Sequence, residues 1–293
     1  MELDYVKLKE IKPALAAFII ESQALLKRSV IPDEKAVHDI RVLMKKTRAV
    51  LRLVSPQLEN PFYERDIADL REVGRILSYR RETSVRRKIL KEFRKKFPEI
   101  FSKLRENEML TRLLEKQEPA PEPSEEIKSE LEQINSLLSK TGYRIRFQRM
   151  KIIDPQLLIK ELDKTYTIAA DVYLTCRNNP RQEMLHKFRK RAKDFLYQLN
   201  NFRPLNPSII KELGKNLDSM TQNLGKYNDL AMIIKDLGYN YKDQTNLAAM
   251  DELIIKFREA QDSYLGKVWP TAYKVFCPGQ KLVNVLGFKL LVI

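Results

Sequence analysis

The residues best suited to chemistry in this 293-residue chain are a histidine and four basic residues, spaced three or four positions apart. Read as a helix between Pro32 and Pro56, they share one stripe within an arc of about 80°. This first stripe consists of His38, Arg41, Lys45, Arg48 and Arg52. Because like charges on one stripe repel each other, the pattern favours an anionic group opposite the helix.

A second stretch, between Pro180 and Pro204, repeats this arrangement at an offset of 148 residues. The offset pairs the two histidines of the chain with each other, and it also pairs one arginine and one lysine of each stripe. The second stripe consists of His186, Arg189, Lys190 and Lys193. It is weaker than the first, because Leu196 and Asn200 stand where the first stripe has its last two arginines. Self-similarity at half the chain length indicates two homologous helical units.

The repeat continues downstream, where a one-residue slip changes the offset to 147. The segment ILSYRRETSV at 76–85 then aligns with NLGKYNDLAM at 223–232, which matches Arg81–Glu82 with Asn228–Asp229. These pairs are interpreted first as helix caps and ties between helices. Arg81 is also a candidate contact for an anion, and so is Arg75, which shares a helix face with Arg71.

The composition indicates a polyanionic partner. A net charge of +15 and a pI near 9.6 suit nucleic acid, an acidic membrane surface or a phosphate polymer, and a generic basic surface is the alternative. The two cysteines, Cys176 and Cys277, are far apart and fit a reducing cytosol better than a disulfide or zinc site. Without a signal-peptide core or a run of apolar residues long enough to span a bilayer, we expect a soluble cytoplasmic protein.

Apolar periodicity predicts an all-α fold without strands. Besides the two helices with basic stripes, the expected helices are Leu3–Val30, Tyr63–Tyr79, Glu82–Phe97, Ile100–Leu114, Ile127–Leu138, Asp154–Arg177, Ser208–Leu224, Leu230–Leu237 and Leu247–Tyr264. The basic segment TGYRIRFQRMK at 141–151 is expected to form a turn. A short helix and an irregular tail are expected from Gly266 onward.

The segment QEPAPEPSEE at 117–126 divides the chain. Its three prolines and four glutamates predict an acidic, extended linker. We therefore expect one helical half at residues 1–116 and a second half, with the tail, at residues 127–293.

The paired motifs VHDIRVLMKKTRAVLRL and LHKFRKRAKDFLYQL, followed by RRETSV and LGKYNDLA, resemble the CHAD domain, the conserved histidine α-helical domain. The resemblance runs from the first helix to about Trp269. It implies two four-helix-bundle-like halves, related by pseudo-twofold symmetry around a basic central channel. It also implies binding of inorganic polyphosphate and association with polyphosphate granules, with no catalytic activity.

Carried onto this chain, the resemblance and the basic stripes predict one set of polyphosphate-binding residues. They are His38, Arg41, Lys45, Arg48, Arg52, Arg75, Arg81, His186, Arg189, Lys190 and Lys193. The family often has arginine where Lys45 and Lys46 stand, and aspartate where Glu82 stands. For the histidines, a phosphate contact and a structural hydrogen bond both stay open.

Two other functions stay open. The charge suits a helical nucleic-acid-binding protein, although no known nucleic-acid-binding motif is visible. An enzyme acting on phosphorylated substrates would need a carboxylate cluster for Mg²⁺, and the sequence has no such cluster. We predict no catalytic residues, no metal site, no cofactor and no membrane partner.

Overall fold

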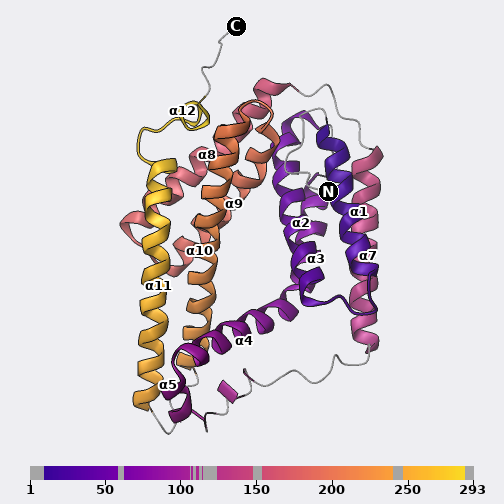
Figure 1. The fold of residues 1–293 in the computed structure, drawn as a ribbon. Helices are drawn as coiled ribbons and strands as arrows, with labels where there is room; N and C mark the ends of the chain where they lie inside the picture. Colours follow the sequence, from indigo (N-terminus) through magenta and orange to yellow (C-terminus); the bar gives the residue numbers. More distant parts are fainter. Residues whose placement is uncertain are drawn as a thin grey trace.

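The chain folds into two groups of long helices that stand side by side, and one helix crosses between them at one end (Figure 1). This computed structural model describes residues 10–58, 63–105, 107, 110, 111, 114, 124–147, 154–239 and 247–287, without the side chains of residues 79–84. The described residues form helices and no strands, which confirms the predicted all-α fold.

The first group contains four helices. They are α1 (Ile11–Lys27), α2 (Glu34–Val54), α3 (Tyr63–Ile76) and α7 (Glu125–Phe147). Although α7 follows the acidic segment in the sequence, it packs against α1 and α3. Arg144 in α7 forms ion pairs with Asp66 (2.5 Å) and Asp69 (2.6 Å) in α3. The turn expected at 141–151 is therefore wrong as far as Phe147, because buried Ile145 and the ion-paired Arg144 continue the helix.

The second group also contains four long helices. They are α8 (Pro155–Asn178), α9 (Gln182–Leu199), α10 (Pro207–Tyr239) and α11 (Leu247–Phe276), and the short α12 (Leu282–Leu286) follows them. The prediction of separate helices at Ser208–Leu224 and Leu230–Leu237 is wrong, because α10 runs unbroken through both. The prediction that α11 ends before Gly266 is also wrong. The helix continues through Pro270 to Phe276, because Ala272 and Phe276 are buried.

Helix α4 (Ser78–Lys96) connects the two groups. It begins directly after α3 rather than at Glu82 and crosses toward the lower end of α10 (Figure 1). There Arg86 pairs with Asp236 of α10 (3.0 Å), and Leu90 joins a small apolar cluster with residues of α10 and α11. The helix expected over Ile100–Leu114 is shorter: α5 spans Pro98–Lys103, and much of the remaining segment lies outside the described residues.

The main apolar core is continuous across both groups. At its centre α2 packs against α9, and Gln198 Nε2 donates a hydrogen bond to the Ala49 carbonyl (3.0 Å). The two helices that carry the basic stripes are therefore direct neighbours. The division at the 117–126 linker stays a prediction, because residues 117–123 lie outside the described residues. The pseudo-twofold relation between the two halves also stays a prediction.

Candidate anion-binding site

The first basic stripe lies along the edge of α2, beside the core. Asp33 caps the helix by accepting a hydrogen bond from the Ala36 amide (2.6 Å). Ile40 and Met44 are buried on the adjoining face, whereas the four basic residues of the stripe are half-buried and His38 is exposed. Burial of the apolar face sets the rotation of α2, so the basic side chains are held at the boundary between core and solvent.

Arg41 and Arg189, which the repeat pairs with each other, make equivalent hydrogen bonds to a neighbouring helix. Arg41 Nη1 donates to the Gly74 carbonyl in α3. Arg189 Nε donates to the Thr221 carbonyl in α10 (3.1 Å). Gly74 and Thr221 are themselves related by 147 residues, the offset of the downstream repeat. Each arginine is therefore held by the backbone of the helix that follows its own, and the duplication extends to hydrogen bonding.

Gly225, in the LGKYNDLA segment, leaves room for the guanidinium of Arg189. A Cβ atom at position 225 would lie 3.2 Å from both Nε and Nη2 of Arg189. At Gly214 of the same helix, the nearest atom would lie 3.8 Å away, which is an ordinary contact. Sequence reasoning missed this role of Gly225, because a glycine within a helix does not reveal which neighbour lies against it.

Lys45 lies at the centre of five cations drawn from both stripes, which we call the cationic cluster. The cluster consists of Arg41, Lys45 and Arg48 on α2, with Arg189 and Lys193 on α9. Burial and the charges of these four neighbours lower the pKa of Lys45 from 10.5 to about 8. Lys45 makes no ion pair or side-chain hydrogen bond with any residue that the structure describes. The structure thus brings the two predicted stripes together around an uncompensated lysine.

Arg48 is a second cation without full compensation. Its Nε is buried and has no hydrogen-bond partner within the described part of the chain. A buried donor in this condition costs about 1–3 kcal/mol. Burial lowers the pKa of Arg48, as do the nearby charges of Arg52 and Arg71, whereas Asp194 raises it. An anion entering the cluster would both accept from Arg48 and offset this repulsion.

Arg52, the last member of the first stripe, is held by an acid. Its Nη1 and Nη2 donate to the two carboxylate oxygens of Asp194 in α9, at 2.7 and 3.3 Å. Its Nε donates to the Arg48 carbonyl (3.2 Å). Because this bidentate pair offsets its charge, Arg52 ties α2 to α9 and lies at the edge of the site.

The second stripe is less cationic, because Lys193 has an acidic partner. Lys193 Nζ donates to Asp218 Oδ1 in α10 (2.7 Å) and lies 5.6 Å from the centre of the Tyr197 ring. The 147-residue offset aligns Asp218 with Arg71, so an acid reaches the second stripe where the first stripe has another cation. Sequence reasoning missed this pairing, although the offset could have revealed it. Lys190 is exposed on the same helix.

The two histidines differ in their surroundings. His38 is exposed, whereas His186 is half-buried. Burial lowers the pKa of His186, and the charges of Lys190 and Arg189 lower it further, while a hydrogen bond with Asn228 raises it. His186 Nδ1 is buried and has no hydrogen-bond partner among the described residues. The hydrogen bond to Asn228 in α10 suits a structural role for a neutral His186. The Nδ1 atom is still available for a contact with a ligand.

Arg75, another predicted site residue, is not among the five residues of the cluster. Arg75 is exposed and donates to both carboxylate oxygens of Glu72 in its own helix, at 2.6 and 2.8 Å. The side chain of Arg81 lies outside the described residues.

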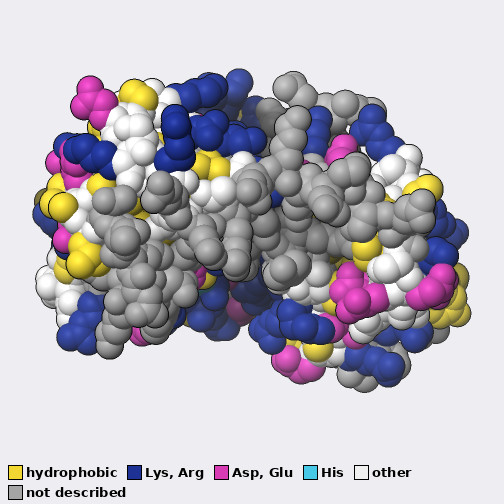
Figure 2. All heavy atoms as spheres, turned by 90° about the horizontal axis from the view of Figure 1, so that it is seen from below, with side chains coloured by type: hydrophobic (Ala, Val, Ile, Leu, Met, Phe, Trp, Pro, Cys, Tyr) yellow, Lys and Arg dark blue, Asp and Glu magenta, His cyan; other side chains and the backbone are white. Residues whose placement is uncertain are grey.

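The described residues contain no group of three potential metal ligands from His, Cys, Asp and Glu. Figure 2 shows Lys and Arg side chains on both halves at the end where α4 crosses.

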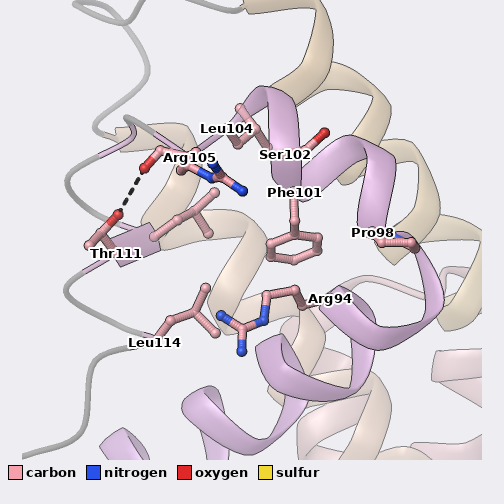
Figure 3. A pocket seen from close by; sticks show the side chains of 9 residues that line it. Arg94, Pro98, Phe101, Ser102, Leu104, Arg105, Thr111 and Leu114 are labelled. Carbon is pink, nitrogen blue, oxygen red and sulfur yellow. Dashed lines mark hydrogen bonds between the residues drawn. The ribbon is translucent and has the colours of Figure 1, made fainter.

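A cavity of about 570 Å³ lies elsewhere, where the end of α4 meets α5 (Figure 3). Apolar side chains such as Phe101 and Leu104 line it together with Arg94 and Arg105. Thr111 Oγ1 donates to the Arg105 carbonyl at its rim (3.4 Å). No predicted site residue lines this cavity, so it is separate from the cationic cluster.

Comparison with known proteins identifies one family. The family model described as the CHAD domain matches residues 14–235, which includes both basic stripes and the downstream repeat, and it confirms the resemblance. No curated protein matches the chain in sequence. Within the described residues, none of the helices has the length and apolar character needed to cross a membrane.

Proposed function

The chain belongs to the CHAD family, and on this premise we propose that it binds inorganic polyphosphate through the cationic cluster without catalysing a reaction. The cluster supplies the central contacts. Further contacts along the phosphate chain are His38, Arg81, His186 and Lys190, with Arg52 and Arg75 at the edges. We further propose that this binding takes place in the cytoplasm, at polyphosphate granules.

The observation that carries the proposal is the position of Lys45. A half-buried ammonium group beside Arg41, Arg48 and Arg189, with no acidic partner among the described residues, is unfavourable in the free protein. Buried charges in proteins are usually paired, so an anion is expected to supply the missing charge. A ligand with several adjacent negative groups offsets the repulsion among all five cations at once, which a single carboxylate does not.

A phosphate polymer suits this arrangement better than a nucleic acid does. It has a negative charge on each unit and no base to read, so its receptor needs only cations held at fixed positions. Two packed helices, with Arg41 and Arg189 each held to a backbone carbonyl, supply such positions. Binding of this kind releases counterions, so the affinity should fall steeply as salt concentration rises.

The test compares long-chain polyphosphate, tripolyphosphate and duplex DNA, at equal total phosphate and at two salt concentrations. We expect long-chain polyphosphate to bind most tightly, with a smaller affinity for DNA at both salt concentrations. The variant Arg48→Gln should bind polyphosphate more weakly, whereas the charge-matched control Lys267→Gln, on the exposed side of α11, should not. Equal or tighter binding of DNA would contradict the proposal and favour the nucleic-acid alternative.

A further inference from the structure

Lys45 differs from an ordinary phosphate-binding lysine in the state of its amine. Arg41 and Arg48 approach it from α2, and Arg189 and Lys193 approach it from α9. Each of these charges disfavours protonation of the Lys45 amine, and partial burial does the same. With a pKa of about 8 instead of 10.5, Lys45 would be a neutral amine in a much larger share of the free protein near neutral pH than an ordinary lysine is.

The same surroundings hold donors for a phosphoryl group. Arg189 donates from Nε to the Thr221 carbonyl, and its Nη groups make no hydrogen bond with the described residues. Arg48 contributes the buried Nε that lacks a partner in the described structure. A small phosphate-bearing molecule attracted to these arginines would therefore lie beside a nucleophilic amine.

We propose that Lys45 is an acylation site for small acyl phosphates, an inference that rests on the proposed anion-binding function. The neutral Nζ attacks the carbonyl carbon of the acyl phosphate, and the bond between that carbon and the phosphate oxygen breaks. An amide forms on Lys45, and inorganic phosphate leaves with the proton that the amine loses. No oxidant or further reactant is needed, because the mixed anhydride is itself the activated acyl donor.

Acylation at this position would act on polyphosphate binding. The amide carries no charge, so the cluster loses its central cation and, with it, the repulsion between Lys45 and the other four charges. The modified protein should therefore bind long-chain polyphosphate more weakly. Bound polyphosphate should in turn protect Lys45, because it fills the site and favours the charged ammonium.

The second stripe contains a matched control for this chemistry. Lys193 occupies the position equivalent to Lys45, but its Nζ is engaged in an ion pair with Asp218 at 2.7 Å. Lys267 is exposed on α11 and serves as a solvent-exposed reference. Differences in labelling among these three lysines therefore report surroundings rather than residue type.

The experiment treats the full-length protein with limiting acetic anhydride or with acetyl phosphate, and follows each lysine by peptide mass spectrometry. With either reagent, we expect Lys45 to be labelled at least about tenfold faster than Lys193 or Lys267. The preference should be larger with acetyl phosphate, and long-chain polyphosphate should suppress it. In the variant Asp218→Asn, labelling of Lys193 should rise.

Two outcomes would overturn the inference, and they differ in what else they affect. If Lys45 reacts no faster than Lys267 with both reagents while polyphosphate still binds, the acylation site is wrong and the proposed function stands. If Lys45 reacts quickly with the anhydride, but acetyl phosphate shows no added preference and long-chain polyphosphate gives no protection, the site does not attract phosphate. That result would contradict the acyl phosphate step and the proposed function together.

Discussion

On α2 the central lysine, Lys45, faces cations from both helices, whereas its counterpart on α9, Lys193, donates to Asp218 at 2.7 Å. The equivalent of Asp218 in the first half of the chain is Arg71, whose charge acts on Arg48. The backbone contacts of the two stripes are nevertheless alike, since Arg41 and Arg189 bond equivalent carbonyls. The two stripes thus share this backbone contact and differ in charge balance.

This difference assigns distinct tasks to the two halves. The acids that pair with stripe residues, Asp194 and Asp218, both belong to the second half, and each offsets one basic side chain of a stripe. Asp194 offsets Arg52 across the boundary between α2 and α9, while Asp218 offsets Lys193 within the second half. The first half therefore supplies most of the uncompensated charge, and the second half supplies the groups that hold the arrangement together.

The largest expected effect is that of Lys45→Met. Loss of the central cation should weaken polyphosphate binding by about tenfold or more, because charge-assisted contacts are worth about 1.5–3 kcal/mol. The free energy of unfolding should instead rise, on the order of 1–2 kcal/mol, since the methionine fills the space without the unfavourable charge. Binding titration and urea unfolding measure the two effects.

Lys193→Met is the matched control for that substitution. It removes a lysine that already has an acid, so the free energy of unfolding should not rise, and affinity should fall by less. A Lys45→Met protein with reduced stability and unchanged affinity would show that Lys45 serves the fold rather than the ligand.

The pH dependence of binding should show the next largest effect. Lys45 loses its proton near pH 8 in the free protein, and a bound anion favours the charged form, so binding takes up a proton. Affinity for polyphosphate should fall by up to about tenfold between pH 7 and pH 9. In Lys45→Arg the guanidinium keeps its charge, and affinity should change little over this range.

The stability of the free protein should rise with pH, whereas its affinity for polyphosphate falls. The pKa of Lys45 is lower in the folded protein than in the unfolded chain, so the unfolded chain binds more protons between about pH 8 and 10.5. In this window Lys45 should make the free protein more stable as pH rises. The control is Lys45→Arg, which keeps its charge throughout this range. If the free energy of unfolding of the unmodified protein fell with pH relative to that of Lys45→Arg, Lys45 would not carry an uncompensated charge.

A smaller effect is expected when the first half is given the acid of the second. Arg71→Asp should offset part of the charge near Arg48 and weaken polyphosphate binding by about fivefold. Arg65→Asp, an equal change of charge at an exposed position of α3, should have a smaller effect. If both variants weaken binding equally, net charge rather than local charge balance determines affinity.

The sequence was sufficient for the elements whose cause is local. Apolar periodicity in α2 and the 148-residue offset predicted both striped helices, because each depends on spacing along the chain. The unbroken α10 was missed because a helix was expected to end before Gly225. A glycine costs about 1 kcal/mol in a helix, and the burial of Leu224 and Leu230 on either side outweighs that cost. The docking of α7 was missed because Arg144 finds Asp66 and Asp69 more than seventy positions away.

The sequence predicted which residues form the cationic cluster, but not which of the basic residues are paired with acids. The stripes identified the five residues of the cationic cluster, because basic residues on one helix face must lie together. They did not show that Arg52 would be offset by Asp194, which is 142 residues away. Whether a predicted cation is free to bind an anion depends on packing between helices, and spacing along one helix does not contain that information.

The smallest expected effect compares Gly225→Ala with Gly214→Ala, two identical changes in α10. Alanine favours a helix over glycine by about 1 kcal/mol, so Gly214→Ala should stabilise the protein by an amount of that order. At position 225 the new methyl group would press on Arg189 at 3.2 Å, which should cancel the gain and displace the guanidinium. Affinity for polyphosphate should then fall by about twofold in Gly225→Ala alone. Equal stabilisation by both alanines, with unchanged affinity, would show that Arg189 moves aside freely and that its bond to Thr221 does not set the geometry of the cluster.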